Sequence, residues 1–278
     1  MREILELRTS EEEAALYVPA GVGETLPLGH VRRLRLDVND PLVEKLRAIE
    51  LEYRAQGTTL FSMCVVERHY TPRELRASEY VKVEFWPFFR PTGVECGTIY
   101  DESAACPHCG SGARQVNELH LELRRIPKSR DLAITQGGEY VISFRLAEVL
   151  RQHRVTGYEL RPIVSRGGRP TSDHHQLVIP SATAEIVPPT RAGGSYLYPE
   201  PDSSRCPDGH VLGHRLLSPL HVSRDSLGDL DWVFTRQKFG RRGGLFHPYP
   251  RMIVTQRLYR LLAEQKVRHL HAEVVHLV

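Results

Sequence analysis

The chain has 278 residues, 41% of them hydrophobic and 26% charged, which allows one large domain or two smaller ones with a sizeable core. A net charge of +3 does not by itself indicate a nucleic-acid-binding protein. No apolar stretch approaches the ~18 residues that a membrane span needs, and the first residues do not form a secretion signal. We therefore expect a cytoplasmic protein with reduced cysteines and no membrane partner.

The first pattern along the chain is a helix with both ends marked. Asp40 is a candidate N-cap, Pro41 suits the first turn and Gly57 can end the helix. The segment 59–70 follows with β-branched and aromatic residues and no breaker, which predicts a strand.

A second helix and two further strands are expected next. Thr71 and Glu74 form a capping-box pattern that predicts the start of a short helix. Apolar and polar residues then alternate over 81–89 and again over 118–126, which is typical of strands. The segment 165–175 is rich in glycine, serine and charge, so we expect a polar loop there.

Two stretches of the chain resemble each other. Val141–Leu146 aligns with Ile253–Leu258, and each stretch predicts a strand, a capped helix and a strand. Each copy lies downstream of a Cys-Pro unit, at Cys106 and at Cys206. We therefore expect an α+β fold of two similar strand–helix–strand lobes joined by a structural zinc site, because glycine-rich phosphate loops and regular βα alternation are absent.

The Pro/Gly/Ser-rich stretch that begins near residue 190 is the best candidate for an internal boundary. We expect three segments, which fold either separately or as one domain. They are an N-terminal α+β segment (1–95), a first zinc-knuckle lobe (96–190) and a second Cys-Pro knuckle lobe (191–278).

The cysteine spacing indicates a metal site. Cys106 and Cys109 are separated by two residues and followed by a glycine, a spacing that lets two sulfurs bind one ion. Redox activity is the alternative, but it usually requires a thioredoxin-like context that we do not find. The Cys206 turn offers a third sulfur and His210, so we predict that these four residues bind Zn²⁺. Cys96 is a substitute ligand or a small buried residue.

The sequence lacks the common catalytic motifs, including H-E-x-x-H and the phosphate-binding and nucleophile-elbow patterns. Soft ligands that fill a zinc shell favour a structural metal and a protein that is not an enzyme. A basic stretch could bind a protein partner or, as the less favoured choice, nucleic acid. Its basic residues are Arg236, Lys238, Arg241 and Arg242. Trp86 and its aromatic neighbours would mark a partner surface if they are exposed.

The order of these features, over roughly residues 96–278, resembles the bacterial double-CxxCG-motif proteins. Cys106 and Cys109 match the first motif, and Cys206 matches the second, but Gly209 and His210 stand where its later cysteine and glycine would be. Some members of that family are immunity proteins, which protect a cell against a toxin. The resemblance thus implies a protein that binds a protein partner such as a cognate toxin. A zinc-ribbon nucleic-acid-binding protein is the alternative.

Overall fold

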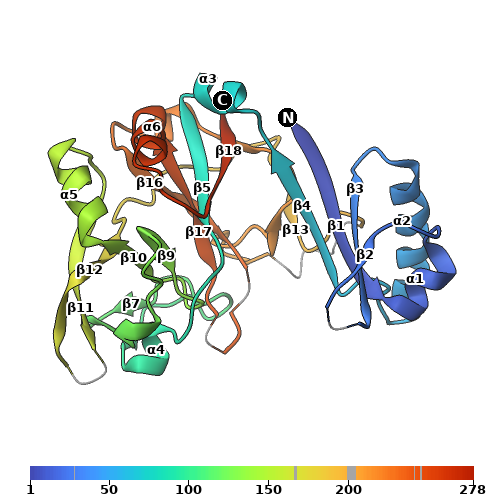
Figure 1. Cartoon of the computed structure of the whole chain (residues 1–278), viewed down its shortest axis with the longest axis horizontal. Coiled ribbons are helices and arrows are strands. Elements are labelled where there is room, and N and C mark those ends of the chain that lie inside the picture. The colour runs from blue at the N-terminus through green and yellow to red at the C-terminus, as the bar shows by residue number, and fades with distance from the viewer. Residues whose placement is uncertain (28, 166–167, 199–204, 241, 245) are drawn as a thin grey trace.

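The computed structural model describes residues 1–278 except 28, 166–167, 199–204, 241 and 245. The fold is mixed α+β, as the sequence predicts, and contains one N-terminal sheet and two five-stranded sheets (Figure 1).

The N-terminal sheet is antiparallel, and α1 and α2 cover one of its faces (Figure 1). Its strands are, in spatial order, β2 (Glu24–Thr25), β3 (Val31–Asp37), β1 (Arg2–Ser10) and β4 (Met63–His69). The helices are α1 (Glu11–Tyr17) and α2 (Pro41–Ala55). As predicted, the Asp40 side chain caps α2 by accepting from the Leu42 amide at 2.9 Å. Leucines from β1, β3 and α2 form the core beneath these helices.

The second sheet follows the first cysteine pair in the chain, and helix α5 (Phe144–Gln152) packs on it. Its strands are, in spatial order, β8 (Leu119–Leu121), β11 (Glu159–Ser165), β12 (Pro170–Val178), β10 (Tyr140–Ser143) and β9 (Leu132–Ile134). β8 is parallel to β11, and the other neighbours are antiparallel.

Helix α6 (Gln256–Glu264) packs on the third sheet, and α3 (Pro72–Ala77) lies beside its strand β18 (Leu270–Leu277). The predicted capping box of Thr71 and Glu74 forms at the start of α3. The strands of this sheet are, in spatial order, β15 (Leu220–Val222), β18, β5 (Tyr80–Phe85), β17 (Tyr249–Thr255) and β16 (Trp232–Phe239). Again the first pair is parallel and the others are antiparallel.

These two sheets have the same pattern of parallel and antiparallel neighbours, but their central strands come from different places in the chain order. β5 precedes the first cysteine pair, yet it is central in the sheet built after Cys206. Conversely, β12 precedes Cys206 and is central in the sheet built after the first pair. The aligned stretches Val141–Leu146 and Ile253–Leu258 occupy the same positions in the two sheets, and α5 and α6 pack into one shared hydrophobic core.

An aspartate fixes the strand-to-helix turn in both sheets. Asp131 accepts hydrogen bonds from Ser143 Oγ at 2.7 Å and from Arg145 Nε at 3.0 Å. Asp231 holds Arg257 in the same way, with Arg257 Nε 3.2 Å from Asp231 Oδ1. Burial alone would raise the pKa of Asp231, but the guanidinium and hydroxyl donors outweigh it and lower that pKa. The similarity of the two units therefore extends to the polar contacts that set helix direction.

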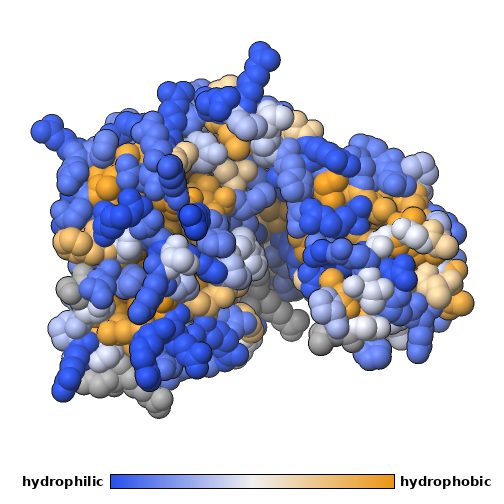
Figure 2. Space-filling model, viewed as in Figure 1, coloured by the Kyte–Doolittle hydropathy of each residue, from blue (hydrophilic) through white to orange (hydrophobic). Residues whose placement is uncertain are grey.

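A buried network of charges joins the N-terminal sheet to the third sheet. Lys82 Nζ lies 2.9 Å from Glu273 Oε1, Arg251 Nη1 lies 2.7 Å from Glu84 Oε1, and Arg68 of β4 reaches Glu273 at 3.8 Å. Burial alone would raise the pKa of Glu273, but Lys82 and its other donors lower it well below its usual range. Figure 2 shows a recess between the part of the molecule that holds the N-terminal sheet and the rest. The charge network borders a cavity of about 540 Å³.

The prediction of a polar loop over 165–175 is wrong in its second half. Strand β12 begins at Pro170, and His174 and His175 pair with β10 rather than lie in a loop. The polar side chains are tolerated because the first residues of β12, as far as they are described, are exposed or half-buried. The predicted boundaries at 95 and 190 stay predictions, although β5 lies before residue 95 and pairs with β17 and β18.

Candidate metal centre

The first cysteine pair lies in the turn of a short hairpin formed by β6 (Tyr100–Asp101) and β7 (Arg114–Gln115). The Cys106 amide donates to the Ser111 carbonyl at 2.8 Å, and the Gly110 amide donates to the Cys106 carbonyl at 2.8 Å. Gly110 has a φ of +73°, a left-handed conformation that favours glycine. The backbone therefore turns both sulfurs toward the same side.

The second turn repeats this arrangement. The Cys206 amide donates to the Val211 carbonyl at 2.9 Å, and the Gly209 amide donates to the Cys206 carbonyl at 2.9 Å. Gly209 is left-handed, with a φ of +76°. The Lys238 amide donates to the His210 carbonyl at 2.8 Å, which fixes this turn to strand β16.

The four predicted ligands lie together. Their ligand atoms are all within 4.8 Å of one another, although Cys106 and Cys206 are 100 residues apart in sequence. The Cys106 and Cys206 sulfurs are 3.7 Å apart, and His210 Nδ1 lies 3.8 Å from Cys109 Sγ and 3.7 Å from Cys206 Sγ. The three cysteines are buried, whereas His210 is exposed. This group can hold a metal ion.

Three of the six separations among the four ligand atoms match the edges of a tetrahedral site. With metal–sulfur bonds of about 2.3 Å and metal–nitrogen bonds of about 2.0–2.1 Å, tetrahedral angles place two sulfurs about 3.8 Å apart and a sulfur and a nitrogen about 3.6 Å apart. The observed separations of 3.7–3.8 Å agree with both values. At these three contacts the ligand atoms already have the separation that a tetrahedral ion of zinc's size requires.

Three further side chains surround the group, and the sequence analysis did not assign them to it. Val211 packs against the buried cysteines. Cys106 Sγ donates to Asp208 Oδ2 at 3.2 Å, so a carboxylate lies beside a sulfur that a metal would convert to a thiolate. Burial lowers the pKa of Lys238, and the nearby Cys109 sulfur opposes this shift. Asp208 lies between two predicted ligands in the Cys206 turn, so the sequence could have indicated it, whereas the proximity of Lys238 depends on long-range packing.

The remaining cysteines lie elsewhere. Cys96 ends helix α4 (Gly93–Cys96), is buried, and does not belong to the four-residue group. Its predicted role as a substitute ligand finds no support in this arrangement. Cys64 is half-buried in β4, where it packs against the N-terminal core.

Two arginines of the predicted basic surface form ion pairs within the chain. Arg242 forms an ion pair with Glu102, and its side chain lies against Gly110, over the first turn. Arg236 Nη1 lies 4.0 Å from Glu185, and Lys238 is half-buried. Arg241 lies outside the described residues. These contacts leave less free positive charge than the sequence suggests.

Aromatic and aliphatic side chains are exposed on the described surface. Trp86 is 48% exposed, and its ring packs on Phe88 with centroids 4.2 Å apart. Ile99 and Val116 are exposed next to each other on the hairpin that carries the first turn, since the Val116 amide donates to the Ile99 carbonyl at 3.0 Å. Among the described residues, no helix is long and apolar enough to cross a membrane.

Comparisons with protein-family models, with curated proteins and with solved structures found no match to this chain.

Proposed function

We propose that Cys106, Cys109, Cys206 and His210 hold a structural Zn²⁺ and that the protein acts without catalysis, by binding another protein. The observation that carries this proposal is the gathering of three sulfurs and one nitrogen within 4.8 Å, with three separations of 3.7–3.8 Å that match tetrahedral edges. Sulfur-rich four-ligand shells are typical of structural zinc, because no coordination position is left for a substrate or for reactive water.

The ion would join segments that are far apart in sequence. One turn belongs to the β6–β7 hairpin, and the other is fixed to β16 through Lys238 and His210. Because the unfolded chain has no such site, the free energy of metal binding contributes to folding. Thiolate ligands need a reducing environment, which supports the proposal of a cytoplasmic protein.

The exposed side chains supply the surface for a partner. Trp86 with Phe88, and Ile99 with Val116, present apolar area that a folded chain normally buries. Aromatic anchors such as tryptophan contribute strongly to protein interfaces. The resemblance to the double-CxxCG-motif proteins adds the expectation that the partner is a toxin and that this chain is its immunity protein.

Affinity capture from the organism that encodes the chain tests this proposal. We expect the protein to retain a defined partner, and Trp86→Ala to weaken that capture at unchanged melting temperature. Leu51→Ala is the matched control, because Leu51 on α2 is 49% exposed against 48% for Trp86. Equal capture by both variants would exclude the tryptophan surface.

Tight binding of DNA or RNA by this protein would overturn the proposal. Replacement of Arg241 and Arg242 by alanine should leave any weak binding to DNA or RNA unchanged at ~150 mM salt. Sub-micromolar binding that falls steeply with salt and vanishes in this double variant would show that the protein binds nucleic acid, since each neutralised phosphate releases counterions.

A further inference from the structure

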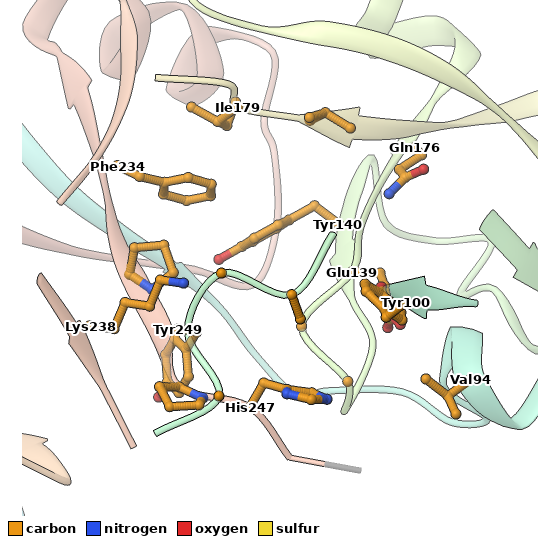
Figure 3. Close-up of a pocket in the computed structure, with 18 of the residues that line it drawn as sticks. Val94, Tyr100, Glu139, Tyr140, Gln176, Ile179, Phe234, Lys238, His247 and Tyr249 are labelled. Carbon is orange, nitrogen blue, oxygen red and sulfur yellow. The ribbon is translucent and has the colours of Figure 1, made fainter. Parts of the chain in front are cut away.

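A cavity of about 250 Å³ lies between the two five-stranded sheets, beside the first cysteine turn (Figure 3). Phe234 and Lys238 of β16 and Tyr249 of β17 line one side. Tyr100 of β6 and Gln176 of β12 line the other side. The volume is near the lower end of the range for small-molecule pockets, so an occupant would be small.

Aromatic side chains lie on both sides of the cavity. Tyr140 extends between the two sides, and its ring centroid lies 5.9 Å from that of Phe234. At the other side the Tyr100 and His247 rings stack with centroids 6.3 Å apart. Rigid rings on both sides offer flat apolar contact to an aromatic or aliphatic group.

The polar groups at the two sides differ in how many hydrogen-bond or ion-pair partners they have within the chain. Glu139 accepts from the Gly93 amide at 3.2 Å, from the Tyr100 hydroxyl at 3.2 Å and from Thr135. On the other side, Lys238 forms no ion pair with any carboxylate among the described residues, and the Tyr140 hydroxyl has no hydrogen-bond partner there either. One wall thus has a cation and a hydroxyl donor available, whereas the opposite carboxylate is already satisfied.

We infer that this cavity binds a small carboxylate with an aromatic or apolar body, the carboxylate against Lys238 and the body between the rings. A carboxylate would supply Lys238 with a counter-charge in a partly buried place, where charge-assisted hydrogen bonds are strong. The same chemistry occurs in a free organic acid and in the C-terminal residue of a protein chain. This inference goes beyond the proposed partner binding and does not depend on it.

Titration calorimetry at neutral pH tests the inference with 3-phenylpropionate and its neutral amide, 3-phenylpropanamide. We expect the acid to bind with a dissociation constant in the millimolar range, as suits so small a ligand. The amide should bind at least about tenfold more weakly, because it lacks the charge that pairs with Lys238. N-acetylphenylalanine forms a second arm: binding of this probe alone identifies a chain terminus as the source, and binding of 3-phenylpropionate identifies a free acid.

Three variants locate the binding. Lys238→Met should weaken binding of the acid at least about tenfold, and Tyr140→Phe should weaken it about threefold, through loss of a charged partner and of one donor. Arg236→Met, on the same strand and paired with Glu185, is the matched control and should bind like the wild type.

Three binding results would overturn the inference. They are equal binding of acid and amide, unchanged binding by Lys238→Met, and no binding of any probe up to ~10 mM, beyond which binding is too weak to assign. Metal content is measured on every variant, because Lys238 also lies near Cys109. If Lys238→Met loses its metal, Lys238 supports the metal site rather than a ligand in the cavity, and this result would likewise overturn the inference.

Discussion

Replacement of Cys106 by serine tests whether the four-residue group supports the fold through a bound metal. Cys96→Ser is the matched control: both side chains are buried, at 7% and 6% exposure, but only Cys106 belongs to the group. Any difference between the two variants therefore reports on metal binding rather than on the burial of a serine hydroxyl.

Cys106→Ser is expected to destabilise the protein more than Cys96→Ser. A buried Cys→Ser change costs about 1–3 kcal/mol because a hydroxyl is more costly to bury than a thiol, and this is the effect expected for Cys96→Ser. Structural zinc binds peptides with roughly 10–16 kcal/mol, and loss of even a third of that amount removes about 4 kcal/mol from folding. At about 2–4 °C per kcal/mol for a chain of this size, Cys106→Ser should melt roughly 8–16 °C below the wild type.

Thermal melts with and without a chelator, together with zinc analysis, provide the assay. The wild type should lose stability when chelator is added, and Cys106→Ser should already have lost both the metal and the chelator response. The reasoning is refuted if Cys96→Ser loses as much zinc as Cys106→Ser, or if the chelator lowers the melting temperature of the wild type no more than that of Cys106→Ser.

Three further predictions follow from the charges described above. Asp231→Asn should cost about 2 kcal/mol at neutral pH, as expected for a hydrogen-bonded charge. Because the folded pKa of Asp231 is lowered, its contribution is present above the unfolded pKa of ~3.9 and is lost as the pH falls through the folded value, so wild type and variant should converge in acid melts. Glu273→Gln should destabilise by about 3–5 kcal/mol in urea titrations, since it leaves Lys82 and Arg68 buried without their partner, and a cost below ~1 kcal/mol would show that the network is not important. Asp208→Asn should bind zinc more tightly in a competition titration, because it removes a carboxylate 3.2 Å from the Cys106 sulfur, and weaker binding would show that Asp208 supports the site.

The local part of the structure could be predicted from the sequence. Caps and turn residues act over a few positions, so Asp40 and the Thr71–Glu74 box define helix starts that the structure confirms. The Cys106–Cys109 pair and the Cys206 turn are local as well, and their spacing indicates one shared site, which the observed cluster supports.

The long-range part could not be predicted. Strand β5 alternates like any other strand, and nothing in its residues shows that it pairs with β17 and β18 rather than with the strands near it in sequence. In the same way, the position of Lys238 near Cys109 and the pairing of Arg242 with Glu102 follow from how the sheets pack. The basic stretch looked like a free surface because its partners lie more than 50 residues away or on another element.

X-ray absorption at the zinc edge, on protein purified without added metal, tests the central claim most directly. We expect about one zinc per chain, bound by three sulfurs at about 2.3 Å and one nitrogen at about 2.0–2.1 Å. A shell with fewer than three sulfurs, a shell with more than four ligands, or protein that contains less than about a tenth of an equivalent of zinc would contradict a closed structural site at Cys106, Cys109, Cys206 and His210.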